Sequence, residues 1–380
     1  MDALLSPDAA ASEGDGGQLD RDAASGSHDA ASAGADAGPA DVASRYAVGF
    51  TPFPYALGTA AQDFVYEKLA SEANITAHHL DDGVPWPESL GGQPYHPNVV
   101  DEWQERKSRT PVGHKVFLAV TPLDTDRRGL ALYKKESGNL ALPEAWSTYA
   151  LDAPEVKTAF LAYCKRAIDF FQPDFVAIGI EVNLLIKNSN ERWPAYLRLH
   201  SSVYTGLKAQ YPNLPVFVSL TGFDLAGYTD APQDDQGQAL SDLLPYSDLL
   251  GLSLHPQLSV FLAETVPAES DLERIFSLSS KPVAVCETSY PAEASSAYGG
   301  ALPISGSAAK QDLFFQRLFA IADRHPTRFV VNFIVRDYDD LWTAMGSPDE
   351  LSKVWRDTGL YDGEGNARLV RQRWMEKLAP

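Results

Sequence analysis

Residues 175–183 read FVAIGIEVN, an apolar run that is followed at once by the carboxylate of Glu181 and the amide of Asn183. Residues 282–291, PVAVCETSYP, repeat this arrangement with Glu287. Short runs of β-branched apolar residues are typical of strands that are buried on both faces, as in parallel sheets. Burying a charged group at the end of such a strand costs free energy unless the charge is paired, so an acid there has a structural partner or a function. The two acids therefore mark a candidate functional site.

The same kind of apolar run occurs eight times after Tyr46. The eight expected strands are residues 46–50, 74–80, 115–120, 175–180, 216–221, 249–254, 282–286 and 328–335. Between them lie segments whose apolar residues are three and four apart, which predicts helices. The clearest are residues 61–73, 155–171, 192–211, 271–279 and 308–325, and two weaker ones lie near 97–108 and 349–357.

Eight strands that alternate with helices predict an α/β fold, a single (β/α)8 TIM barrel over residues 45–380. A doubly wound open sheet is the alternative, but no glycine-rich nucleotide-binding motif follows any of the strands. Residues 1–44 are rich in Ala, Gly, Asp and Ser and contain no aromatic residue. Such a segment cannot bury enough surface to offset its ordering entropy, so we expect a disordered acidic linker.

The composition of residues 1–44 resembles tethers that follow a lipid anchor or an export signal. We therefore expect an extracellular, cell-surface or periplasmic bacterial protein, although no signal peptide is visible in this sequence. The formal charge of −20 argues against a nucleic-acid partner, because an acidic surface repels phosphate. No apolar run approaches the ~20 residues that span a bilayer. The oligomeric state is left open.

Neither a cofactor nor a metal is predicted. Cys164 and Cys286 lie in apolar segments, which favours two buried free thiols over a disulfide. His78 and His79 are adjacent, so on a strand they point to opposite faces. A metal-dependent hydrolase or lyase that uses residues 78–82 remains a weaker alternative.

Polar and aromatic residues collect after the predicted strands, where (β/α)8 barrels carry their active sites. The predicted substrate contacts are Asp82, Trp86, Asp124, Asn183, His255, Gln257, Tyr290 and Trp342. Aromatic faces can stack on the apolar faces of sugar rings while polar groups bind the hydroxyls, so the set favours a carbohydrate. Asp81 and Tyr338 are further candidates. Most of the scattered cations, Arg127, Arg128, Lys134, Lys135 and Arg336, are expected to be solvated.

Two facing carboxylates are the minimum equipment for glycoside hydrolysis. We expect Glu181 and Glu287 to meet across the barrel mouth, one donating a proton to the leaving oxygen and the other attacking the anomeric carbon. Apolar neighbours, Ile180 and Val182, predict a raised pKa for Glu181, which suits an acid/base. For either glutamate taken alone, a salt bridge at the barrel rim is the alternative.

At these residues the sequence resembles the clan A glycoside hydrolases. LLGLSLHPQ (249–257) is similar to the sixth-strand motif of that clan, in which His255 takes the place of a residue that contacts the nucleophile. PVAVCETSYP resembles the seventh-strand motif of family 53 endo-β-1,4-galactanases, and TGLYDGEGNAR (358–368) is similar to a tail before the last helix. The resemblance implies that Glu181 is the acid/base and Glu287 the nucleophile.

One position departs from that resemblance. The family reads Gly-Asn-Glu at the fourth strand, with the asparagine on the 2-hydroxyl of the sugar, and this chain has Ile180 there. Asn183 or another polar group replaces the contact, or the sugar is unusual, or activity is lost. The predicted function is a glycosidase that cleaves β-linked polysaccharide or oligosaccharide by a retaining mechanism. The alternative is a non-catalytic carbohydrate-binding protein on a glycosidase scaffold.

Overall fold

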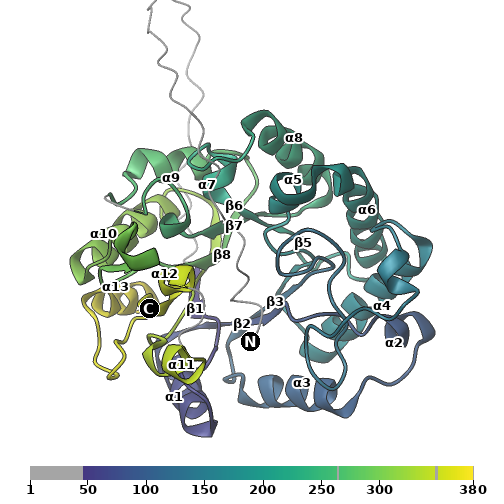
Figure 1. Ribbon diagram of the computed structural model, residues 1–380, viewed down its shortest axis with the longest axis horizontal. Coiled ribbons are helices and arrows are strands. Elements are labelled where there is room, and N and C mark those ends of the chain that lie inside the picture. The colour runs from purple at the N-terminus through teal and green to yellow at the C-terminus, as the bar shows by residue number, and fades with distance from the viewer. Residues whose placement is uncertain (1–45, 263–264, 347–349, 380) are drawn as a thin grey trace, which may run out of the picture.

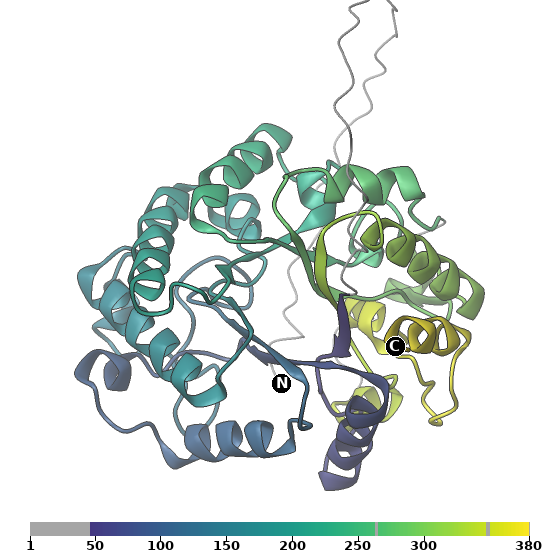
Figure 2. The ribbon, with the colours of Figure 1, turned by 180° about the vertical axis from the view of Figure 1, so that it is seen from behind.

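Parallel strands form the centre of the molecule and helices surround them (Figures 1 and 2), which confirms the predicted (β/α)8 barrel. The structure is a computed structural model that describes residues 46–262, 265–346 and 350–379. The predicted linker, residues 1–44, lies outside the described residues. The barrel strands are β1 (Ala47–Phe50), β2 (Ile75–Leu80), β3 (Lys115–Val120), β4 (Phe175–Ala177), β5 (Val216–Phe217), β6 (Ser219–Thr221), β7 (Leu250–Leu254), β8 (Val283–Thr288) and β11 (Thr327–Asn332).

The barrel closes through one split strand. The sheet order is β5-β4-β3-β2-β1-β11-β8-β7-β6, and every pair in it is parallel. The predicted strand 216–221 is divided at Val218 into β5, which pairs with β4, and β6, which pairs with β7. Because these two halves are consecutive in the chain, the two ends of the sheet belong to one strand.

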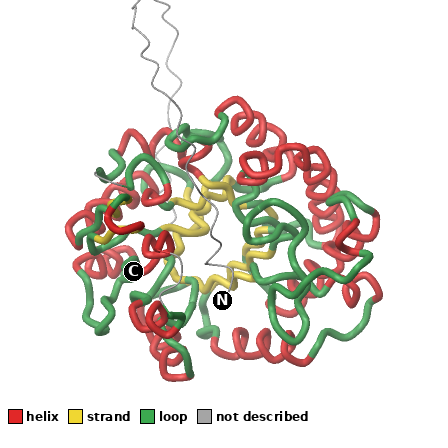
Figure 3. The backbone as a smooth tube through the Cα atoms, viewed as in Figure 1, coloured by secondary structure: helices red, strands yellow, loops and turns green. Residues whose placement is uncertain are grey.

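Helices pack around the outside of the sheet (Figure 3). They are α1 (Thr59–Glu72), α2 (Trp86–Gly91), α3 (Pro97–Arg109), α4 (Pro154–Phe171), α5 (Leu184–Ser189), α6 (Trp193–Gln210), α7 (Gly222–Leu225), α8 (Gln233–Leu243), α9 (Glu269–Phe276), α10 (Ala308–Ala322), α11 (Asp339–Ala344), α12 (Lys353–Arg356) and α13 (Leu369–Leu378). A short antiparallel hairpin, β9 (Ser295–Ala297) and β10 (Leu302–Ile304), follows β8. Among the described helices, none combines the length and apolarity needed to cross a membrane.

Alternate strand residues divide the core into two parts, as the period of a strand requires. One apolar cluster fills the barrel interior and includes Phe117, Phe175, Phe217 and Phe329, whose rings lie 4.8–6.5 Å apart. The other lies between the sheet and the helices. Cys164 and Cys286 are buried and free, which confirms that prediction. The filled interior leaves the carboxyl ends of the strands as the place for a site.

Candidate active site

A cavity of about 520 Å³ lies at the carboxyl ends of the barrel strands. Its walls combine carboxylates, cations and aromatic rings. The lining residues are Phe53, Pro54, Gln62, His79, Asp81, Asp82, Glu102, Arg106, Thr125, Asp126, Arg127, Glu181, His255, Glu287, Phe333, Tyr338 and Trp355. A pocket of this size, with apolar rings and a few convergent polar groups, is typical of a small-molecule or oligosaccharide site.

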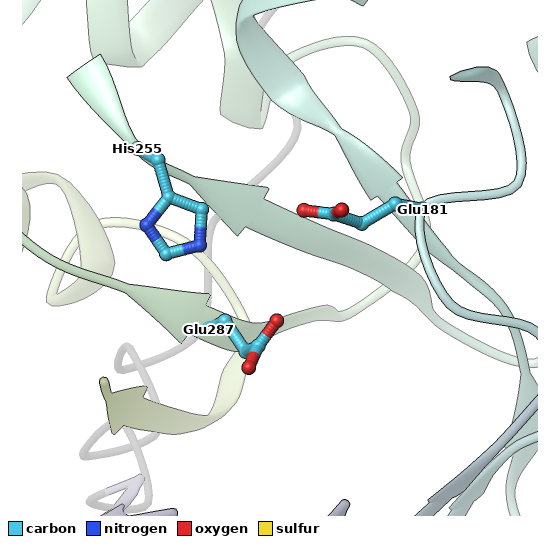
Figure 4. A group of neighbouring side chains, drawn as sticks. All are labelled: Glu181, His255 and Glu287. Atoms are coloured by element: carbon cyan, nitrogen blue, oxygen red, sulfur yellow. The ribbon is translucent and has the colours of Figure 1, made fainter. Parts of the chain in front are cut away.

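The two predicted catalytic glutamates meet in this cavity. One carboxylate oxygen of Glu181, one of Glu287 and one ring nitrogen of His255 all lie within 4.8 Å of one another. Figure 4 shows the carboxylates of Glu181 and Glu287 turned toward a shared space, with the His255 ring beside Glu287. The separation is far below the limit of about a nanometre that a glycosidase pair tolerates.

The backbone before Glu181 explains how the acid reaches the cavity. β4 ends at Ala177, earlier than predicted, and Glu181 itself has a φ of 49°. A side chain at Gly179 would place its Cβ 2.6 Å from Val182 Cγ1 and 2.7 Å from the Tyr196 hydroxyl, so a larger residue would have to displace these buried side chains. The amide of Glu181 donates to Ser219 Oγ at 3.0 Å. The left-handed conformation of Glu181 is uncommon for a non-glycine residue and is often found at functional sites.

Burial sets the protonation of the two acids. Burial raises the pKa of Glu181 to about 7, against the opposing charge of Arg127 and with a further increase from the Glu287 carboxylate. Burial also raises the pKa of Glu287 above its usual range, while His79 opposes that increase. One proton shared between two close carboxylates is the arrangement expected when like charges face each other.

A chain of alternating charges lies along the wall next to Glu287. His79 Nδ1 is 3.3 Å from Glu287 Oε1, and His79 Nε2 is 3.7 Å from Asp81 Oδ2. Arg127 binds both oxygens of Asp81, at 2.9 and 2.6 Å. Burial opposes ionisation of Asp81, yet Arg127 lowers the pKa of Asp81 below its usual range.

His255 is a neutral member of the site. Burial lowers the pKa of His255 to about 3, and the neighbouring charge of His79 adds to that effect. Its Nδ1 lies 2.8 Å from Ser289 Oγ, and its ring meets Trp355 edge to face at a centroid distance of 4.7 Å. A neutral imidazole can donate from one nitrogen and accept at the other.

Of the predicted substrate contacts, the structure places His255 and Asp82 on the cavity wall. Both oxygens of Asp82 accept hydrogen bonds from Lys134 Nζ, at 2.7 and 2.6 Å. Lys134 also donates to Glu102 Oε2 at 2.5 Å. Asp82 therefore reaches the cavity as half of an ion pair, with part of its hydrogen-bonding capacity already used.

Two predicted polar contacts lie away from the cavity wall because their amides are used inside the protein. Asn183 is fully buried and donates to Thr221 Oγ1 at 2.7 Å and to Gln236 Oε1 at 2.8 Å. Gln257 is buried and donates to Ser289 Oγ at 2.6 Å. Asn183 therefore lies off the cavity wall, and its amide group donates to Thr221 and Gln236.

The remaining predicted contacts also lie off the cavity wall. Trp86 is fully buried, stacks on Trp146 at 5.3 Å and donates to the Ala131 carbonyl. Tyr290 is buried against Phe314, with ring centroids 5.4 Å apart. A ring enclosed in the core has no free face for a sugar. Asp124 accepts a hydrogen bond from the Arg128 amide, and Trp342 lies on α11 outside the lining.

The structure adds site residues that the sequence did not identify. Arg127, one of the scattered cations of which most are expected to be solvated, is buried at 4% exposure. The aromatic wall consists of Phe53, Phe333, Tyr338 and Trp355, of which only Tyr338 was a candidate. Phe53 follows β1 closely, so the position of active sites after barrel strands could have identified it. Trp355 lies on α12, far along the chain from any strand, and gives no such signal.

No family model and no curated protein sequence matches the chain. Solved structures do resemble it. A GH5_18 from Streptomyces cattleya in complex with GlcNAc has a TM-score of 0.60 at 11% identity, and the match covers 88% of this chain and 80% of that one. An exo-β-1,4-mannosidase, Op5Man5, from Opitutaceae bacterium strain TAV5 has a TM-score of 0.57 at 12% identity, over 87% and 58%.

A fungal β-1,4-galactanase structure has a TM-score of 0.50 at 16% identity, over 83% of this chain and 90% of that one. The chain spans about three fifths of the length of the mannosidase. In fold, the chain is therefore similar to the clan A glycoside hydrolases of families 5 and 53, as its strand-end motifs predict.

Proposed function

We propose that this protein is a retaining glycosidase that cleaves β-linked oligosaccharide or polysaccharide, with Glu181 as acid/base and Glu287 as nucleophile. One observation carries the proposal: a carboxylate oxygen of Glu181 lies within 4.8 Å of one of Glu287, and both residues line one cavity. Retaining enzymes hold their carboxyl groups ~5–5.5 Å apart, whereas inverting enzymes need ~6.5–9.5 Å to admit a water molecule.

The division of roles follows from the surroundings of each acid. Glu181, whose pKa burial raises to about 7, is protonated in weakly acidic solution and can donate its proton to the leaving oxygen. Glu287 faces the cation His79 and is the better candidate for the ionised group. Its carboxylate forms a bond to the anomeric carbon as the glycosidic bond breaks. Glu181, now ionised, then takes a proton from the water that cleaves the glycosyl ester and releases Glu287.

The walls of the cavity support a carbohydrate substrate. Phe333 and Trp355 provide flat apolar surfaces on the cavity wall, and Asp126 and Gln62 provide hydrogen-bonding groups on the same wall. The similar structures are named as a β-1,4-galactanase and an exo-β-1,4-mannosidase, which supports β-linked sugars as the class. The acidic Ala/Gly/Ser composition of residues 1–44 favours action on such material outside the cytoplasm.

The test compares Glu181→Gln and Glu287→Gln with Glu144→Gln, an exposed acid outside the cavity. Wild type is screened on aryl β-glycosides and on a polysaccharide panel, and product anomers are followed by NMR. We expect β-anomers as first products, a loss of ~10²–10⁴-fold or more in either cavity variant, and no loss in Glu144→Gln. Full activity in either cavity variant, or α-anomers as first products, would refute the proposal.

Ile180 favours a second candidate, a carbohydrate-binding protein without catalysis. Its side chain is buried in the apolar cluster of the barrel interior and offers no hydrogen bond to a sugar. In glycosidases a hydrogen bond to the 2-hydroxyl of the sugar strengthens in the transition state and supplies several kcal/mol. Retained binding to a glycan array, with no release of chromophore from any activated aryl glycoside, would select this candidate.

A further inference from the structure

His79 points into the cavity because of its place on β2. Neighbouring residues on a strand face opposite sides, and His78 lies on the outer side, where its Nε2 is 3.0 Å from Thr110 Oγ1 and its ring packs on Phe171. The side chain of His79 is 12% exposed and lies between Glu287 of β8 and Asp81 beyond the end of β2. The ring edge also meets Phe53, at a centroid distance of 6.1 Å.

Both ring nitrogens of His79 face carboxylate oxygens, at 3.3 Å for Nδ1 and Glu287 and at 3.7 Å for Nε2 and Asp81. A neutral imidazole carries one N–H and one lone pair, so it would turn the lone pair toward one of the two carboxylates. The imidazolium has two N–H groups and can turn one toward each carboxylate. The geometry itself therefore favours the charged ring.

Asp81 cannot turn away from His79 without breaking its own ion pair. Arg127 holds Asp81 through two hydrogen bonds and also donates to the Asp124 carbonyl at 2.8 Å. The guanidinium is buried, and a buried pair of this kind is costly to separate. Among the residues that the structure describes, His79 is the side chain that forms an ion pair with Glu287.

We infer that His79 is a positioning residue: as an imidazolium fixed by Asp81 and Arg127, it holds the Glu287 carboxylate ionised and oriented for attack. The effect of His79 on attack by Glu287 rests on the proposed function. The charged state of His79 and its contact with Glu287 do not depend on that function. Apolar Ile180 at the end of the fourth strand makes no polar contact with Glu287, so the support comes from β2. When Glu287 becomes a neutral ester, the favourable pairing with His79 is lost, and it returns when the ester is hydrolysed.

The charged groups around the ring come from several elements. Glu287 is on β8 and Asp81 follows β2, Arg127 is in the loop after β3, Glu181 follows β4, and His255 follows β7. Burial opposes protonation of His79, but Glu287 and Asp81 raise the pKa of His79 above its ordinary value. Arg127 acts in the opposite direction. The carboxylates of Glu287 and Asp81, which face the ring, raise the pKa of His79 by more than the Arg127 cation behind Asp81 lowers it.

The structural part is tested by NMR titration of the histidine ring signals, assigned with His79→Asn, in wild type, Glu287→Gln and Asp81→Asn. We expect the ring of His79 to be an imidazolium at pH 7, and its titration midpoint to fall by about one pH unit or more in either variant. His325 pairs with Glu273 at 2.8 Å outside the cavity and serves as the internal control, with an unchanged midpoint. A neutral His79 at pH 7, or an unchanged midpoint in Glu287→Gln, would overturn the inference.

The catalytic part is tested by kinetics on the substrate that the aryl glycoside screen identifies. His79→Asn should lower kcat/KM on the order of 10²-fold and move the acidic limb of the pH profile upward, while His79→Arg restores part of both and His325→Asn changes neither. An unshifted acidic limb in His79→Asn would refute the positioning role while the glycosidase proposal stands. If wild type cleaves no glycoside, the proposed function fails, and the NMR titration still decides the state of His79.

Discussion

Arg127 and Asp81 form a two-pronged ion pair, with Arg127 Nη1 2.9 Å from Asp81 Oδ1 and Arg127 Nη2 2.6 Å from Asp81 Oδ2. Their side chains are 5% and 13% exposed. The pair joins the loop after β2 to the long loop after β3, so that one wall of the cavity is held together by charge. Planar two-point binding fixes the orientation of both groups.

We expect Arg127→Met to destabilise the fold by about 3–5 kcal/mol, because Asp81 then loses its two-point partner in a buried place and keeps only the longer contact with His79, at 3.7 Å. The free energy of unfolding in urea at pH 7 measures this. Arg198→Met is the matched control, since Arg198 binds Asp152 at 2.6 Å but is 58% exposed. That exposed pair should contribute about 1 kcal/mol or less.

The double variant Arg127→Met/Asp81→Asn completes the cycle. We expect it to be less destabilised than the sum of the two single variants, because the buried charge of Asp81 is removed together with its guanidinium partner. An Arg127→Met protein no less stable than Arg198→Met would contradict the expected cost of separating this buried pair.

Activity should fall as the pH rises through about 7. Only protonated Glu181 can donate to the leaving group, and burial raises the pKa of Glu181 to about 7. The basic limb of kcat/KM against pH, measured from pH 4 to 9 on an aryl glycoside, reports this group in the free enzyme. A leaving group that departs without protonation should flatten the limb, and a limb near pH 4.5 would contradict the assignment.

The same raised pKa predicts that Glu181 destabilises the folded protein in neutral solution. Between pH 4.5 and about 7 the folded protein binds more protons at Glu181 than the unfolded chain does, so stability falls as the pH rises through this window. Glu181→Gln should therefore raise the free energy of unfolding at pH 8 by about 1–3 kcal/mol. The gain should disappear at pH 4, and Glu144→Gln should show no gain at either pH.

The fold could be predicted from the sequence because the barrel strands are apolar runs, and the segments between them have apolar residues at the helical spacing of three and four. The break at Val218 could not be predicted, since nothing in the pattern of VFVSLT (216–221) interrupts a single strand and its division depends on pairing with two different strands. α8 was missed because its sequence is polar and contains Gly237. The hairpin β9–β10 has strands of three residues each, too short to produce a periodic pattern.

The sequence predicted those site residues that have reactive or polar side chains and stand directly at the end of a strand. Glu181, Glu287 and His255 directly follow or end apolar runs, and the parallel arrangement brings them together. Trp86 also follows a strand, but there the chain turns into α2 and buries the ring against Trp146. Whether a side chain beyond a strand faces the cavity or the core depends on the path of the loop, which local sequence does not encode.

The last prediction concerns Ile180, which is 2% exposed within the apolar cluster of the barrel interior. Ile180→Asn would bury an amide among apolar side chains and should destabilise the fold by about 2–4 kcal/mol. Ile180→Val removes one methyl group and should cost about 0.5–1.5 kcal/mol. Urea unfolding of the two variants at pH 7 makes the comparison. If the Asn variant is as stable as the Val variant, its amide reaches polar partners at the mouth of the barrel, and the fourth strand can supply the sugar contact that the resembled family uses.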